Sequence, residues 1–237
     1  MKKVVTLCLL FAVGMVSVSA AKTNLSKKPK RKMIPLPAPK TEGGPALTEA
    51  LAKRRSIRNF DPDRVLTDAE LGQLCWAAQG INRPGGRFRT CPSAGATYPL
   101  EMYIVTARGV YHYLPKPHAV EEWAPGDLRG KVQSAALNQP WVGRAPAVFV
   151  LAADFRRTAK KYGARAKRYV HIEAGHAAQN LHLQAVALNL GSVPVGAFID
   201  RRVAKVLGLP ALQTPLYLVP IGQYPKVIGN TISEEKK

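Results

Sequence analysis

Apolar side chains along the chain recur either three to four residues apart, as on one face of a helix, or in short unbroken runs, as in buried strands. The first pattern predicts helices over residues 47–54, 67–80, 128–137, 168–190 and 200–207. The second predicts strands over residues 101–106, 110–114, 147–152 and 216–219, the first two joined as a hairpin through Arg108-Gly109. Strands and helices without a regular strand–helix–strand alternation indicate the α+β class.

Polar and glycine residues mark the ends of several of these elements. Thr67 and Glu70 form the pattern of a capping box at the start of the second helix. Gly191 is expected to cap the C-terminus of helix 168–190, and Asp200 the N-terminus of the last helix. Helix 168–190 is apolar around much of its circumference, which predicts a central helix or one at a subunit interface.

The N-terminus has the three parts of a secretory signal peptide: Lys2-Lys3, an apolar run over residues 4–18, and small residues around Ala20. The apolar run is shorter than the roughly 20 residues that span a bilayer, and no other segment is apolar enough to be transmembrane. We therefore expect a signal peptide at 1–20 and export to a bacterial periplasm. Residues 21–44 are expected to be a basic, Pro-rich linker, 45–230 the domain and 231–237 a tail.

The chain has 237 residues, of which 46% are apolar, so a disordered or fibrous protein is excluded. Lys and Arg number 35 against 15 acidic residues, a formal charge of +20. Two of these charges belong to the signal peptide and seven to residues 22–40, so residues 41–237 carry +11. Such a charge suggests an anionic partner. Nucleic acid is not expected, since no binding motif is present and aromatic residues make up only 7%.

Cys75 and Cys91 remain after the signal peptide is removed. An oxidising compartment permits a disulfide between them, but two buried free thiols are favoured because Cys75 lies in an apolar helical stretch. No zinc-binding motif is present. His171, His176 and His182 are spaced by five and six residues and do not share a helix face, so no metal site is expected.

Three segments have the residue types of a ligand site. Arg54-Arg55-Ser56-Ile57-Arg58 offers guanidinium and hydroxyl donors to a phosphate, although a solvated helix end has the same composition. Residues 92–101, PSAGATYPLE, contain small residues that let backbone N–H groups approach a ligand, or form an ordinary turn. Residues 191–198, GSVPVGAF, could present main-chain donors to a flat ring or form a buried edge.

Together with Ala174–Leu181, which looks like the family's central helix, these segments resemble the nitroreductase-like flavoproteins, closest to the branch of the SagB-type azoline dehydrogenases. The resemblance runs from about Leu47 to Lys226. It implies an α+β nitroreductase-like fold, with a mixed or antiparallel sheet flanked by helices, and a homodimer with FMN at the subunit interface.

The resemblance also assigns roles residue by residue. It implies that the FMN phosphate is held by Arg54, Arg55, Ser56, Arg58 and Lys226. It implies that Pro92, Ser93, Ala94 and Gly95 line the ring from the partner subunit. Pro194, Val195, Gly196 and Ala197 are expected at the redox edge of the ring, with Gln139 near the ring or the substrate.

Two features depart from the family pattern. No carboxylate stands before Gly196, where many nitroreductases carry a Glu, and the Lys/Tyr pair of azoline dehydrogenases is not assigned. No catalytic residue is therefore assigned. The resemblance implies an oxidoreductase that takes electrons from NAD(P)H or another donor and passes them to a small organic acceptor such as a nitro compound or quinone, and the signal-peptide pattern predicts that it is exported. The alternative is a catalytically weak flavin-fold protein that binds an anionic envelope ligand or partner.

Overall fold

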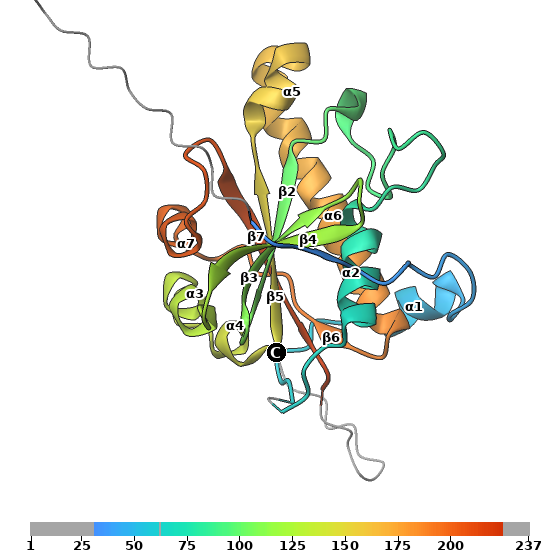
Figure 1. The fold of residues 1–237 in the computed structure, drawn as a ribbon, viewed down its shortest axis with the longest axis vertical. Coiled ribbons are helices and arrows are strands. Elements are labelled where there is room, and N and C mark those ends of the chain that lie inside the picture. The colour runs from blue at the N-terminus through green and yellow to red at the C-terminus, as the bar shows by residue number, and fades with distance from the viewer. Residues whose placement is uncertain (1–30, 62, 225–237) are drawn as a thin grey trace, which may run out of the picture. The chain divides into compact units, whose positions relative to one another are not determined.

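The computed structural model describes residues 31–61 and 63–224. Within them, seven strands form one sheet in the order β1-β4-β3-β2-β5-β7-β6 (Figure 1). The strands are β1 Met33–Pro35, β2 Leu100–Thr106, β3 Gly109–Leu114, β4 Ala119–Pro125, β5 Ala147–Ala153, β6 Gly191–Ser192 and β7 Thr214–Gly222. Every neighbouring pair is antiparallel, so the sheet is antiparallel rather than mixed.

Helices cover both faces of the sheet (Figure 1). One face carries α1 Leu47–Lys53, α2 Asp68–Gln79 and α6 Ala166–Ala187, with α5 Phe155–Tyr162 packed on α6. The other carries α3 Arg129–Ala135, α4 Pro140–Arg144 and α7 Asp200–Leu207. Short 3₁₀ turns lie at Ala94–Ala96 and Gly163–Arg165. The α+β prediction is confirmed.

Strand β5 divides the core between the two faces. All seven of its residues are buried, as the unbroken apolar run predicts. Phe149 and Leu151 point into the cluster beneath α2 and α6, whereas Val148 and Val150 point into the cluster beneath α3, α4 and α7. Successive side chains of a strand alternate between faces, so this one strand supplies both cores.

Helix α6 runs through the larger cluster and is central, as its apolar composition predicts. The predicted cap at Gly191 is wrong, because the helix ends at Ala187 with Leu188 in the C-cap position, and Gly191 is a residue of β6. The predicted cap at Asp200 is also wrong. Ile199 takes the N-cap position of α7 without a side-chain hydrogen bond, and Asp200 begins the helix itself.

At the start of α2 the predicted capping box is confirmed. The Glu70 N–H donates to Thr67 Oγ1, and the Thr67 N–H donates to the Glu70 carboxylate. Cys75 and Cys91 are buried free thiols, and burial raises the pKa of both. They therefore pack as small apolar groups, which is the alternative that the sequence favours.

Part of the expected linker belongs to the sheet. Met33–Pro35 forms β1 and pairs with β4, and the Arg31 guanidinium lies 3.4 Å above the Trp123 ring. The linker prediction is therefore wrong for this stretch. The strand itself is Met-Ile-Pro, but it is only three residues long and lies in a basic, Pro-rich stretch, which has the composition of a linker.

Four further elements are not predicted by the sequence patterns: β4, β6, α4 and α5. Helix α5 is strongly basic and buries only Thr158 among its eight residues, so it has no apolar stripe to detect. Within the described residues, none of the helices has the length and hydropathy needed to cross a bilayer. The signal peptide predicted at 1–20 and the tail predicted at 231–237 lie outside the described residues.

Candidate functional site

The basic segment that follows α1 runs beside β6. Ser56 forms a parallel bridge with Ser192, and the Ile57 N–H donates to the Ser192 carbonyl at 2.9 Å. Ile57 packs on the core, while Ser56 and Arg58 are exposed. The close approach requires Gly191, because a Cβ there would lie 2.6 Å from Ile57 Cγ2. The pairing thus fixes the expected phosphate donors at the edge of the sheet.

The segment after β6 continues along the same edge. Val195 forms a two-way bridge with Leu218 on β7, with its N–H donating at 2.7 Å and its carbonyl accepting at 3.1 Å. Beyond the bridge, Gly196 and Ala197 are exposed. The Gln139 amide donates to the Ala197 carbonyl at 2.7 Å and to the Ala136 carbonyl at 2.9 Å. The side-chain amide of Gln139 therefore holds the Gly196–Ala197 segment in place, and its two N–H groups are not directed toward a ligand.

The charges at this edge suit an anion. In the described part of the chain, Arg54, Arg55 and Arg58 form no ion pair. The Arg58 guanidinium lies 5.4 Å from the centre of the Trp141 ring, and the buried Trp141 Nε1 has no acceptor among those residues. Unpaired guanidiniums, a serine hydroxyl and an orphaned indole N–H are the donor types that a phosphate accepts.

A buried histidine lies beneath strand β6 and contacts Ser192. His182 of α6 is 3% exposed, and its Nδ1 lies 2.8 Å from Ser192 Oγ. Burial, together with the nearby Arg54 charge, lowers the pKa of His182 to about 4. The imidazole is therefore neutral at physiological pH and adds no positive charge to the edge.

The other expected ring-lining residues, Pro92–Gly95, lie elsewhere on the chain. The Tyr98 N–H donates to Ser93 Oγ at 2.9 Å, and the segment makes a tight turn in which Gly95, Ala96 and Tyr98 have φ of 59°, 54° and 45°. Left-handed backbone at two non-glycine residues is strained and is held by the surrounding structure. Such strain is commonly found at functional sites.

Beneath this turn, on α6, lies a buried acid. Glu173 is 2% exposed and its Oε1 has no hydrogen-bond partner among the described residues. Burial raises the pKa of Glu173 to about 7, opposed by a hydrogen bond with Ser93 and by the charge of Arg89. The Cys91 thiol donates to the Glu173 main-chain carbonyl at 3.6 Å.

Helix α6 separates the two groups of expected site residues. His182 contacts the edge segment and Glu173 contacts the turn segment. At a rise of roughly 1.5 Å per residue these positions lie about 14 Å apart along the axis. The structure brings Arg54, Ser56, Arg58, Gln139 and Val195–Ala197 together at the edge, but it places Pro92–Gly95 apart from them in one chain. Lys226 lies outside the described residues.

An adjacent Lys–Tyr pair stands against the turn segment and is missed by the sequence reasoning. At the end of α5, Lys161 Nζ and Tyr162 Oη would lie 2.8 Å and 2.7 Å from a Cβ placed on Gly95. The pair is distant in sequence from residues 92–95. The sequence does contain one signal that could have identified the pair: Lys161 and Tyr162 are adjacent and stand directly before Gly163.

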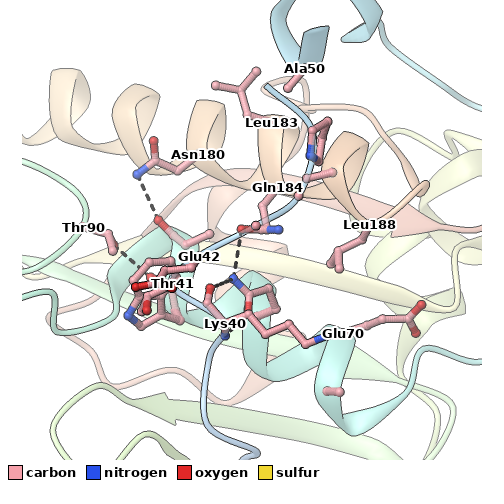
Figure 2. A pocket seen from close by; sticks show the side chains of 18 of the residues that line it. Lys40, Thr41, Glu42, Ala50, Glu70, Thr90, Asn180, Leu183, Gln184 and Leu188 are labelled. Carbon is pink, nitrogen blue, oxygen red and sulfur yellow. Dashed lines mark hydrogen bonds between the residues drawn. The ribbon is translucent and has the colours of Figure 1, made fainter. Parts of the chain in front are cut away.

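A cavity of about 660 Å³ lies between α1, α2, α6 and residues 40–45 (Figure 2). Several of its polar groups are hydrogen-bonded within the protein. Gln73 Nε2 donates to the Lys40 carbonyl at 3.0 Å and to Gln184 Oε1 at 3.2 Å, and Asn180 donates to the Ala77 carbonyl at 2.9 Å. None of the expected cofactor residues lines it. We therefore do not assign the chemistry to this cavity.

The half-buried carboxylate of Glu101 is held in ion pairs and has a structural role. Glu101 lies between His112 and Arg157, with His112 Nε2 at 2.7 Å. Burial opposes ionisation of Glu101, but these two partners outweigh it and lower the pKa of the carboxyl. Among the residues that the structure describes, no three His, Cys, Asp or Glu side chains gather as a metal site would require.

Comparison with known proteins gives the classification. Residues 51–223 match the model of the Nitroreductase family. The chain belongs to the nitroreductase family. It is 41% identical over 183 residues to "Putative nitroreductase MJ1384" of Methanocaldococcus jannaschii, covering 75% of this chain and 90% of that protein.

Further relatives connect this nitroreductase-family chain with the SagB-like branch. It is 28% identical over 162 residues to the microcin B17-processing protein McbC of Escherichia coli, covering 64% of this chain and 60% of McbC. A nitroreductase-type crystal structure from Ralstonia eutropha has a TM-score of 0.75 at 31% identity, covering 82% of this chain and 90% of that one. The chain is thus an oxidoreductase of the FMN-dependent nitroreductase family with that family's fold.

Proposed function

We propose that the protein binds FMN and uses it to transfer electrons between a donor such as NAD(P)H and a small organic acceptor, a nitro compound, a quinone or a similar molecule. The observation that carries the proposal is the unpaired set of donors at the β6 edge, Arg54, Ser56 and Arg58, beside the exposed backbone of Gly196 and Ala197. FMN, when bound, supplies the hydride and electron chemistry, while the protein supplies position and electrostatics.

Each of these residues has a defined part in the proposal. Arg54 and Arg58 bind phosphate oxygens, with the Ser56 hydroxyl as a third donor. The backbone N–H groups near Gly196 and Ala197 face the ring edge, and Gln139 holds that backbone in place. The neutral imidazole of His182 positions Ser192, to which the basic segment is paired.

We further propose that a second copy of the chain completes the site. The two groups of ring-contacting residues lie about 14 Å apart along α6, so a two-fold arrangement is needed to bring one group from each protomer to the same ring. Helix α6 also leaves apolar side chains uncovered, with Ile172 48% exposed and Leu183 and Val186 half-buried. Uncovered apolar residues along one helix suit a helix–helix interface.

A purified protein with bound flavin tests the proposal. The wild-type chain should bind one FMN per protomer, and R54Q and R58Q should each weaken FMN binding by about tenfold or more, as the loss of a charge-assisted hydrogen bond does. Binding of riboflavin, which lacks the phosphate, should be unchanged. Arg108→Gln is the matched control, because Arg108 lies exposed on the β2–β3 turn beside Asp68. Equal loss of FMN and riboflavin binding would overturn the phosphate assignment.

A second candidate function rests on Lys161 and Tyr162 beside Gly95. Two ionisable side chains next to the ring-lining turn suit the removal of a substrate proton during dehydrogenation. The azoline dehydrogenases, which the chain resembles, use a Lys/Tyr pair. Its test compares two reactions of K161A and Y162F. Both variants should lose oxidation of a thiazoline substrate while still passing electrons from chemically reduced flavin to a quinone. Loss of both reactions together would favour a structural role for the pair.

Export to the periplasm completes the proposal. The N-terminal pattern of Lys2-Lys3, an apolar run and small residues supports it. Cell fractionation of a producing bacterium should recover a chain shortened by about 20 residues in the periplasmic fraction, as the pattern predicts. A full-length chain in the cytoplasmic fraction would contradict it.

A further inference from the structure

A second cavity of about 590 Å³ lies beside the turn segment expected to line the flavin ring. One wall is the loop over residues 82–90, another is the turn itself, and Lys161 of α5 closes one side. The lining residues are Asn82, Arg83, Arg87, Phe88, Arg89, Thr90, Pro92, Ser93, Gly95, Ala96, Tyr98 and Lys161. A cavity of this size accommodates a small organic molecule.

The lining of this cavity carries four cations, Arg83, Arg87, Arg89 and Lys161, and no carboxylate. The guanidiniums of Arg83 and Arg87 lie 5.2 Å and 5.4 Å from the centre of the Phe88 ring. In the described residues, none of the four cations forms an ion pair. A concave surface lined by one sign of charge concentrates counter-ions.

Arg89 is the best-placed of these cations because it is held from several sides. Its Nη1 donates to Gln79 Oε1 at 2.7 Å, and its guanidinium lies 4.6 Å from the centre of the Tyr98 ring. Gln79 is itself buried and neutral, so it orients the guanidinium without neutralising it. Burial lowers the pKa of Arg89, and the charges of Glu101 and Glu173, neither of which forms an ion pair with it or lines the cavity, oppose this shift. A half-buried guanidinium with a neutral partner is positioned to pair with an incoming anion.

We propose that this cavity binds the carboxylate of a small aromatic or unsaturated acid, which is the substrate of the flavin reaction. This inference rests on the proposed function, since the cavity gains its role from the ring expected beside Pro92–Gly95. The planar fork of Arg89 matches a carboxylate in bidentate geometry, and Phe88 and Tyr98 offer aromatic faces to the body of the molecule. A phosphate of the nicotinamide donor shares this oxyanion chemistry, and the experiment separates the two.

Calorimetric titration of the full-length holoprotein tests the proposal without requiring turnover. The probes are 4-nitrobenzoate, its neutral methyl ester, NAD⁺ and NADP⁺, none of which transfers electrons to oxidised FMN. Wild-type protein should bind 4-nitrobenzoate at least tenfold more tightly than the ester, with an affinity that falls as salt increases. Arg89→Gln should remove most of this preference and leave the affinity for the ester unchanged. Arg87→Gln should lower the preference for 4-nitrobenzoate over the ester about threefold, as expected for an exposed charge.

Two controls keep the test decisive. Arg144→Gln, an exposed cation at the end of α4, should retain the full preference. If R89Q fails to fold, R83Q/R87Q at exposed positions replaces it, with an expected loss of about tenfold. Equal affinity of wild-type protein for acid and ester would overturn the proposal. So would an R89Q variant that loses affinity for NADP⁺ relative to NAD⁺ but keeps its affinity for nitrobenzoate. Failure of the flavin proposal is distinguished from failure of this one, because the purified protein would then contain no bound FMN.

Discussion

The side-chain amide of Gln139, just before α4, donates a 2.7 Å hydrogen bond to the carbonyl of Ala197, which follows β6 by five residues. The bond joins a loop on one face of the sheet to the exposed backbone expected at the flavin's redox edge. The same amide also donates to the Ala136 carbonyl at 2.9 Å, so both of its N–H groups are directed into the protein.

Gln139→Ala should therefore loosen the Gly196–Ala197 backbone without removing a ligand of the phosphate. Losing one such hydrogen bond costs about 1 kcal/mol, so kcat/KM should fall about fivefold while the FMN dissociation constant changes little. Steady-state kinetics and FMN titration of the same preparation measure both. Gln184→Ala, in the cavity of Figure 2, is the matched control and should leave both values unchanged. A large loss of FMN affinity in Q139A would show that Gln139 contacts the cofactor directly.

Gly191→Ala tests the pairing of β6 with the basic segment. A Cβ at this position would lie 2.6 Å from Ile57 Cγ2, so the substitution should destabilise the fold by roughly 1–3 kcal/mol, as overpacking does. Urea unfolding measures the change. In the I57A background, G191A should lower the free energy of unfolding by less than it does in the wild-type chain, because the smaller side chain at position 57 relieves part of the clash.

The control for this prediction is Gly130→Ala in α3, where a Cβ meets no atom within 4 Å. Alanine should stabilise that helix by up to about 1 kcal/mol. Equal and small effects of G191A and G130A would contradict the packing assigned to Ile57.

Glu173 and His182 predict opposite dependences of stability on pH. The pKa of Glu173 is raised to about 7 from its ordinary 4.5, so the folded chain binds the extra proton and loses stability as pH rises through this window. The pKa of His182 is lowered to about 4 from 6.5, so the unfolded chain binds the extra proton and the fold loses stability as pH falls through that window.

Thermal unfolding of E173Q and H182Q across pH 4 to 8 separates the two effects. The melting temperature of E173Q, relative to wild type, should rise as pH increases from about 4.5 to 7. That of H182Q, relative to wild type, should rise as pH decreases from about 6.5 to 4. Because each comparison is made with wild type at the same pH, the other carboxylates cancel. Curves parallel to wild type would show that neither group titrates abnormally.

Ile172→Glu tests the second copy of the chain. Ile172 is 48% exposed on α6, and a carboxylate there should disfavour an apolar interface between two copies. Light scattering after gel filtration should show a dimer for wild type and a monomer for the variant, with loss of bound FMN. Leu212→Glu changes a similarly exposed residue in the loop before β7 and should remain dimeric. A dimeric I172E that retains FMN would place the interface elsewhere.

The sequence by itself determined the elements with strong local signals. The unbroken run over residues 147–152 predicts β5 because a strand buried on both faces has no polar positions. The capping box at Thr67 and Glu70 predicts the start of α2 because both of its hydrogen bonds form within one turn. The ordered basic, small-residue and apolar segments were sufficient to indicate the family.

Only the tertiary structure decided which of these segments meet. Gly191 looked like a helix cap, yet its small size serves the approach of Ile57 from a segment distant in sequence. Strand β1 is only three apolar residues long, too short for a periodic pattern, and pairing with β4 forms it. The positions of Lys161–Tyr162 against Gly95, and of Arg89 against Gln79 and Tyr98, likewise depend on contacts between separate elements. Local propensity acts over one turn or strand, whereas a site is made by long-range packing, and for that reason its geometry becomes visible only in the folded chain.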